Sequence, residues 1–82
     1  MNSELAELRV VRDYLLEELP IAIESGNWQS QRTLFGIACA ITNAEIKADI
    51  LNNYLLMPGH DFHEEATLEI ERLGVIPPGP RS

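Results

Sequence analysis

Apolar residues recur along the first part of the chain at the spacing of an amphipathic helix. From Ser3, a permitted N-cap residue, they return every three or four positions and therefore share one helix face. Acidic residues such as Glu7 and Glu17 fall mostly on the opposite side. The apolar positions are Leu5, Leu8, Val11, Leu15 and Leu19. This pattern predicts a first helix that begins at Ser3.

Pro20 is expected to close this helix. Proline has no backbone N–H group and its ring clashes with the preceding turn, so the helix should end near Glu18 or kink there. Residues 21–25 are then expected to form only a short helical turn. Gly26 and Asn27 mark the connection that follows.

A second helix is expected over residues 27–41, with Asn27 as its capping residue. Its second half, residues 34–41, is apolar all round. Such a segment is usually the buried centre of a bundle, although in so short a chain one side can instead meet another subunit. Gly36 costs helical stability, so its presence hints at close approach by a neighbouring backbone.

A third helix is expected after a capping-box pattern. Thr42 and Glu45 are spaced so that a hydroxyl and a carboxylate each satisfy an exposed backbone amide, and the helix should begin at Asn43. Pro58 and Gly59 should end it. Its apolar stripe consists of Ile46, Ile50, Leu51, Tyr54 and Leu55.

A fourth helix is expected over residues 61–73. Asp61 and Glu64 repeat the capping arrangement with an aspartate as the cap, and Gly74 is a natural C-terminal cap. The buried face of this helix should contain Phe62, Ala66, Ile70 and Leu73.

These elements predict an all-α fold, an irregular bundle of four main helices arranged as antiparallel helical hairpins. No segment shows the alternating pattern of a half-buried strand. A chain of 82 residues has room for one core, which we expect in a single domain over residues 1–75. Residues 76–82 are rich in proline and are expected to form a flexible tail.

The net charge and apolar content of the chain indicate which classes of partner are not expected. Thirteen Asp and Glu residues against six Lys and Arg give a formal net charge of -7, and the basic residues are scattered rather than clustered. Nucleic acid is therefore not expected as a partner, although a surface that mimics nucleic acid stays open. The longest apolar stretch is far shorter than the roughly 20 residues that span a bilayer, and glutamates stand where a signal peptide has basic residues. We expect a cytoplasmic protein with no membrane partner.

Cys39 is the only cysteine, so the chain can form no internal disulfide bond. Its neighbours are Ala38 and Ala40, and no histidine is close in sequence. A small core hydrophobe is therefore expected at this position rather than a nucleophile.

Metal binding is the best candidate for chemistry, because His60, Asp61, His63 and Glu64 fall within five positions. The two histidines are three apart across a helix boundary, however, whereas zinc proteases place two histidines four apart on one helix face. We therefore expect no metal and no cofactor here, and His60 and His63 are kept as weak candidates only. Adjacent carboxylates such as Glu17 and Glu18 point in different directions on a helix, and no catalytic motif is present. An enzyme is not expected.

One stretch of the chain, with two positions of the helix that follows it, contains Leu55, Leu56, Met57, Pro58, Gly59, His60, Asp61, Phe62, His63, Glu64, Ile70 and Leu73. It resembles a helix junction of small HEAT-like bacterial proteins, some of which are immunity proteins against toxins. In that junction a Leu-Leu pair ends one helix, and a histidine and a His-Glu pair open the next. The likeness covers about a quarter of the chain and implies packing of helical hairpins, but it transfers no functional residue.

A protein-binding module without catalytic activity fits these observations best. Its acidic helices would contact another, basic protein, as a toxin-neutralising or regulatory protein would. The expected contact residues are Glu17, Glu18 and Glu24 with an exposed Trp28, although a core position for Trp28 is favoured over an exposed one. The main alternative is a homo-oligomeric structural protein that uses residues 34–41 as a homodimer core. A metal-dependent enzyme is the third hypothesis.

Overall fold

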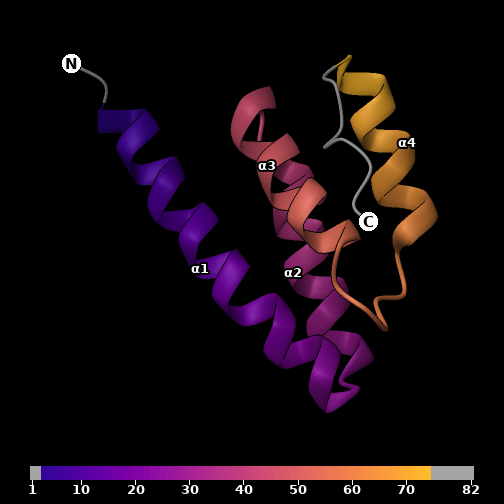
Figure 1. Ribbon diagram of the computed structural model, residues 1–82. Helices are drawn as coiled ribbons and strands as arrows, with labels where there is room; N and C mark the ends of the chain where they lie inside the picture. Colours follow the sequence, from indigo (N-terminus) through magenta and orange to yellow (C-terminus); the bar gives the residue numbers. More distant parts are fainter. Residues whose placement is uncertain (1–2, 75–82) are drawn as a thin grey trace.

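The computed structural model describes residues 3–74, and the predicted all-α fold is confirmed. The helices are α1 (Ser3–Ser25), α2 (Trp28–Ala40), α3 (Ala44–Leu55) and α4 (His63–Leu73) (Figure 1). No strand occurs within residues 3–74. The predicted tail over residues 76–82 lies outside the described residues. None of the described helices is long and apolar enough to cross a membrane.

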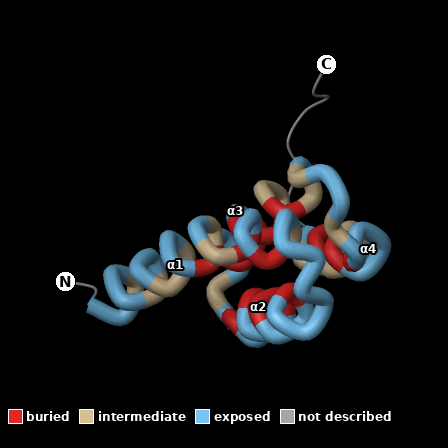
Figure 2. Tube along the Cα trace, turned by 90° about the horizontal axis from the view of Figure 1, so that it is seen from below, coloured by how far each residue is buried: buried red, intermediate tan, exposed pale blue. Residues whose placement is uncertain are grey.

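Successive helices run in opposite directions and form two hairpins. α1 packs against α2 and α3, and α4 packs against α3 on the side away from α1 (Figure 1). Buried residues gather where the four helices face one another, while the first turns of α1 extend beyond the core (Figure 2). The most buried side chains of the core are Leu15, Leu19, Gln31, Ile50, Leu51, Tyr54 and Ile70.

The prediction that the first helix ends near Glu18 is wrong, because α1 continues through Pro20 to Ser25. Residues 21–25 are thus part of α1 and not a separate turn. Pro20 is exposed, so the backbone carbonyl that proline leaves unpaired lies on the solvent side of the helix. Leu19 and Ala22 on the other side are buried, and their packing offsets the cost of the proline.

The caps of α2 and α3 are made by asparagines. The Asn27 side chain accepts a hydrogen bond from the Ser30 amide at 3.0 Å, as predicted for this capping residue. At α3, Asn43 and not Thr42 is the cap, and its side chain accepts from the Ile46 amide at 2.9 Å. The Asn43 amide oxygen thus pairs with the Ile46 amide, one position beyond the Glu45 amide that the capping-box interpretation assigned to the threonine hydroxyl.

The start of α4 differs from the prediction. The helix begins at His63, its N-cap is Phe62, and no side chain caps it, so the assignment of Asp61 and Glu64 as capping residues is wrong. Asp61 contacts Gln31 of α2 instead. The other end agrees with the prediction, because Gly74 adopts the left-handed C-cap conformation with φ 72°.

The apolar second half of α2 is buried on one side only. Leu34, Phe35 and Ala38 are buried, whereas Ile37 is 42% exposed. Gly36 is also exposed, and no atom of another described element lies within 4 Å of the position that a Cβ atom would occupy. The predicted close approach of a neighbouring backbone to Gly36 is therefore wrong.

Candidate functional site

A groove between α1 and α2 combines exposed apolar side chains with an acidic side chain. We call it the α1–α2 groove. Its volume is about 540 Å³. It is lined on the α1 side by Tyr14, Glu18 and Ile21, and on the α2 side by Ser30, Thr33 and Leu34.

Both walls of the groove follow from helix periodicity. Tyr14 and Ile21 are seven positions apart and therefore lie on one strip of α1, where they are 55% and 58% exposed. Val10, one turn before Tyr14, continues this strip and is 68% exposed. On α2, Ile37 lies one turn beyond Thr33 on the same face. The groove is thus bordered by apolar side chains that the fold leaves in water.

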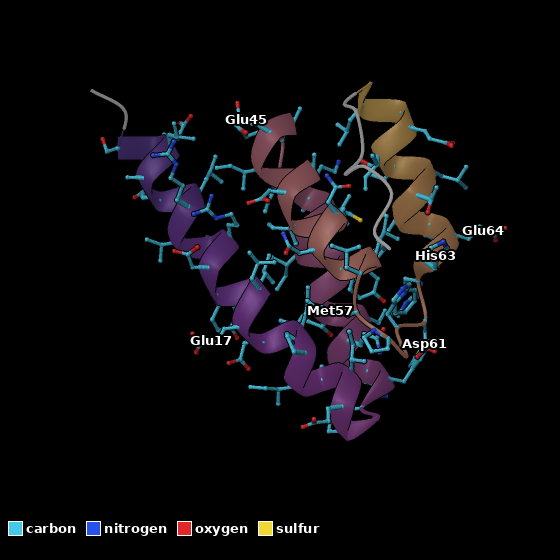
Figure 3. All side chains as sticks on the ribbon, viewed as in Figure 1. Glu17, Glu45, Met57, Asp61, His63 and Glu64 are labelled. Carbon is cyan, nitrogen blue, oxygen red and sulfur yellow. The ribbon has the colours of Figure 1, made fainter. Side chains whose placement is uncertain are left out.

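The charges at the groove are acidic. Glu18 lines it, and Glu17 lies on the same exposed strip as Tyr14 and Ile21. Glu17 projects from the outer side of α1, away from α3 (Figure 3). Among the residues that the structure describes, neither glutamate has an ion-pair partner.

The basic residues of α1 lie on its other side, toward α3. Arg9 and Arg12 line a second hollow of about 380 Å³ between α1 and α3. Arg12 forms ion pairs there with Asp49 of α3, at 3.6 Å, and with Asp13, at 3.1 Å. Glu45 also lines this hollow, so its charges are mixed, in contrast to those of the α1–α2 groove.

The four predicted contact residues do not form one patch. Glu18 lines the α1–α2 groove and Glu17 lies beside it on the outer face of α1, whereas Glu24 lines a different hollow together with Met57 of the α3–α4 connection. Trp28 lies on the opposite flank of α2, facing that connection. The sequence could group these residues by proximity along the chain but not by position around the helices.

Trp28 is exposed, and the favoured core position is wrong. Its side chain is 51% exposed, and its ring centroid lies 6.4 Å from that of Phe62. The Arg32 guanidinium lies over both rings, with its Cζ 5.5 Å from each centroid. This cation–π arrangement covers part of the tryptophan and holds Arg32 away from the acidic groove.

A buried hydrogen-bond network joins α2, α3 and the start of α4. The Gln31 Oε1 atom accepts hydrogen bonds from the Tyr54 hydroxyl at 2.6 Å and from the Asp61 amide at 2.8 Å. The Tyr54 hydroxyl in turn accepts from the Phe62 amide at 3.1 Å. Burial raises the pKa of Tyr54 to about 12. Sequence reasoning missed Gln31, because a lone glutamine in an apolar helix gives no signal that it is buried.

His60 and His63 lie close together at the same junction. Their rings stack with centroids 5.2 Å apart, and the His60 ring is 4.7 Å from that of Tyr54. Burial, and secondarily the neighbouring His63, hold the pKa of His60 below its ordinary value. The Asp61 carboxylate accepts from Gln31 Nε2 at 3.5 Å. Within residues 3–74, no group of three or more His, Cys, Asp or Glu side chains could hold a metal ion.

A buried ion pair joins α3 to α4. Lys47 is only 8% exposed, and its Nζ atom pairs with the Glu69 carboxylate, which also contacts Arg72. The hydrogen bond from Lys47 holds the pKa of Glu69 below its ordinary value. Sequence reasoning missed this pair, since its two members come from different helices.

Cys39 is partly buried and packs against the core. Burial raises the pKa of its thiol, and the nearby Glu69 adds to this effect. Because the thiolate is the nucleophilic form, a raised pKa is typical of an unreactive core cysteine.

Comparison with known protein families, with curated proteins and with solved structures finds no match. The resemblance of residues 55–64 to a HEAT-like junction stays a prediction. The interpretation of the α1–α2 groove therefore depends on its geometry and its charge.

Proposed function

We propose that the protein is a small acidic protein-binding module whose α1–α2 groove contacts a basic partner protein. One observation carries the proposal. Val10, Tyr14 and Ile21 are each more than half exposed on one strip of α1, beside Glu17 and Glu18, and no basic residue lies on that strip.

The energetics of these side chains support a binding role. Full burial of an apolar side chain of this size contributes about 1.5–3 kcal/mol, and only a little over half of Tyr14 and of Ile21 is exposed, so a partner that covers both gains about 2–3 kcal/mol of gross binding energy. Apolar centres with polar rims are typical of protein interfaces. The glutamates at the rim would steer a basic partner toward the groove and repel an acidic one.

A toxin-neutralising or regulatory role agrees with such a surface. A protein of this kind acts by occupying the surface of its partner and needs no catalytic group. The basic partner would gain specificity from the carboxylates and most of its affinity from the apolar centre.

Self-assembly through the same groove is the alternative, and charge argues against it. A second copy would bring its own Glu17 and Glu18 to the contact, and each copy has a formal net charge of -7. Like charges placed together across an interface cost several kcal/mol. The exposed Ile37 is the observation that favours a homodimer. Sedimentation velocity at low and high salt separates the two, since a homodimer through this face would form more readily at high salt.

The proposal is tested by capture from a lysate of the source cells with three tagged chains. These are the original chain, a Tyr14→Ser, Ile21→Ser variant and a Leu68→Ser control. Leu68 is 60% exposed on α4, so its change removes a similar apolar surface away from the groove. We expect one stoichiometric basic protein that is retained by the original and control chains and lost from the groove variant. Retention by all three chains would refute the proposed site.

A further inference from the structure

The shape of the α1–α2 groove restricts what can occupy it. Its two walls are antiparallel helices that run side by side, and Tyr14 and Ile21 of α1 line the same opening as Thr33 of α2. Val10 and Ile21 are three helical turns apart, which is about 16 Å along α1. A segment of about three turns therefore matches the length of the apolar border.

The backbone of the walls favours a helical occupant. α-Helices satisfy their backbone groups internally, and no strand edge exists within residues 3–74 that an extended peptide could join. An occupant of the groove must therefore satisfy its own backbone amides and carbonyls. A helix does so and packs between two others by placing its side-chain ridges in their groove.

The charge of the walls selects the chemistry of that helix. Among the residues that the structure describes, Glu18 is the only charged one that lines the groove, and Glu17 stands beside it on α1. The nearest basic side chains are engaged elsewhere, Arg12 with Asp49 and Arg32 with the rings of Trp28 and Phe62. Within residues 3–74, no lysine or arginine forms an ion pair with either carboxylate, so both are available to basic side chains of a partner.

We infer that the α1–α2 groove binds an amphipathic α-helix of a basic partner protein, an inference that rests on the proposed function. Apolar side chains of the bound helix, at spacings of three and four, lie between Tyr14 and Ile21 on one wall and Thr33 and Ile37 on the other. Lysine or arginine side chains along the edge of the bound helix face Glu17 and Glu18. This is a helix-in-groove mode of recognition.

The test uses two synthetic peptides of about 18 residues, long enough to form a helix. Both contain the same numbers of leucine and lysine. In the first the leucines follow helical spacing and form one apolar face, and in the second the order is shuffled so that no such face exists. Fluorescence anisotropy with the full chain is expected to show at least tenfold tighter binding of the amphipathic peptide.

Matched variants of the chain locate the binding. Ile21→Ser should weaken binding of the amphipathic peptide about tenfold, whereas Leu68→Ser on α4 should leave it unchanged. A Glu17→Gln, Glu18→Gln variant should lose more affinity, and more of its salt dependence, than Glu64→Gln with Glu65→Gln, which removes the same charge from α4. Glu18 is partly exposed, and the other substituted side chains are exposed. The variants are therefore expected to fold, and thermal melting checks this.

A second readout maps the contact directly. Amide shifts of the isotope-labelled chain, followed by NMR during titration with the amphipathic peptide, should change at Tyr14, Ile21, Thr33 and Ile37. Equal binding of the two peptides, equal losses in groove and α4 variants, or shift changes confined to α4 would each overturn the inference.

The two proposals fail separately. If the peptides bind equally while the partner captured from cells is still lost in the Tyr14→Ser, Ile21→Ser variant, the groove binds a protein surface that is not a basic helix. If neither the peptides nor the captured protein depends on Tyr14 and Ile21, the proposed function falls together with the inference.

Discussion

Removal of a single buried oxygen atom, in Tyr54→Phe, is expected to destabilise the protein substantially. Tyr54 is 0% exposed, and its hydroxyl both donates to Gln31 at 2.6 Å and accepts from the Phe62 amide at 3.1 Å. Phenylalanine keeps the ring but leaves the Phe62 amide without an acceptor. The Gln31 oxygen retains its bond from the Asp61 amide, so it is not left unpaired.

The size of the effect follows from these two losses. A buried donor without an acceptor costs about 1–3 kcal/mol, and the lost hydrogen bond to Gln31 contributes about 1 kcal/mol. The free energy of unfolding should therefore fall by about 3 kcal/mol. A chain of this length has a total of roughly 4–12 kcal/mol, so the variant loses a large share of its stability. At roughly 4–8 °C for each kcal/mol, Tm should fall by more than 10 °C.

Urea unfolding followed by circular dichroism measures the change, and Tyr14→Phe is the matched control. The same atom is removed there from a side chain that is 55% exposed, so the free energy of unfolding should change by no more than about 0.5 kcal/mol. A loss for Tyr54→Phe as small as that of the control would show that the hydroxyl network does not hold the α3–α4 junction.

The pH dependence of the same pair gives an independent check. The pKa of Tyr54 is about 12 in the folded chain, above its ordinary value of 10.0, so the folded state keeps this proton more tightly than the unfolded state. The stabilisation is complete below pH 10 and is lost as pH rises to about 12, with a slope of about 1.4 kcal/mol per pH unit. Tyr54→Phe should remove this alkaline loss, and an unchanged slope would refute the assignment.

Three further predictions concern other features of the fold. Lys47 holds the pKa of Glu69 below its ordinary value of 4.5, so the ion pair stabilises the fold above that pH and this stabilisation is lost as pH falls through the folded-state pKa. In Glu69→Gln, the urea concentration at the midpoint of unfolding should therefore fall less steeply at acid pH than in the original chain. The same pH dependence in both chains would contradict this. Burial lowers the pKa of His60, so the unfolded chain binds this proton more tightly than the folded chain, and stability should fall as pH drops below 6.5. His60→Gln should reduce that fall. The same pH dependence of stability in the variant and the original chain would argue against this role of His60. Gly36→Ala should raise the free energy of unfolding by about 0.5–1 kcal/mol, because Gly36 lies in a helix where a Cβ atom has open space. Gly26→Ala should lower it by about 1 kcal/mol, because Gly26 has a φ of 72°. Changes of Tm in the same direction for both variants would refute this comparison.

The existence of the four helices could be predicted from the sequence because each depends on local periodicity and on nearby turn residues. The ends of the helices depend on how their residues pack against the rest of the fold, which periodicity does not describe. Pro20 lies inside α1 since burial of Leu19 and Ala22 outweighs the lost backbone hydrogen bond. Asp61 does not cap α4, because Gln31, distant in sequence, binds its amide and its carboxylate.

The candidate site could be predicted only in part. Acidic residues and an exposed tryptophan suggested a protein contact, but Glu24 and Trp28 lie away from the groove that Glu18 lines. A groove is formed by two helices together, so its residues become a set only when both helices are placed. The sequence shows Tyr14 and Ile21 on one strip of a helix but does not show that this strip faces away from the core.

Buried polar contacts and exposed apolar side chains have different roles in this fold. Tyr54 of α3 is hydrogen-bonded to Gln31 of α2, and Lys47 of α3 is paired with Glu69 of α4, so these contacts join one helix to another. The α1–α2 hairpin instead exposes apolar groups: more than half of the Tyr14 and Ile21 surfaces lies in water, so these side chains add little to the stability of the fold. Exposed apolar surface raises the risk of aggregation, and it brings a compensating gain when a partner covers it. Because the polar network and the groove lie on different sides of α2, changes at Tyr14 and Ile21 should alter binding without altering stability, which is the behaviour of an interface.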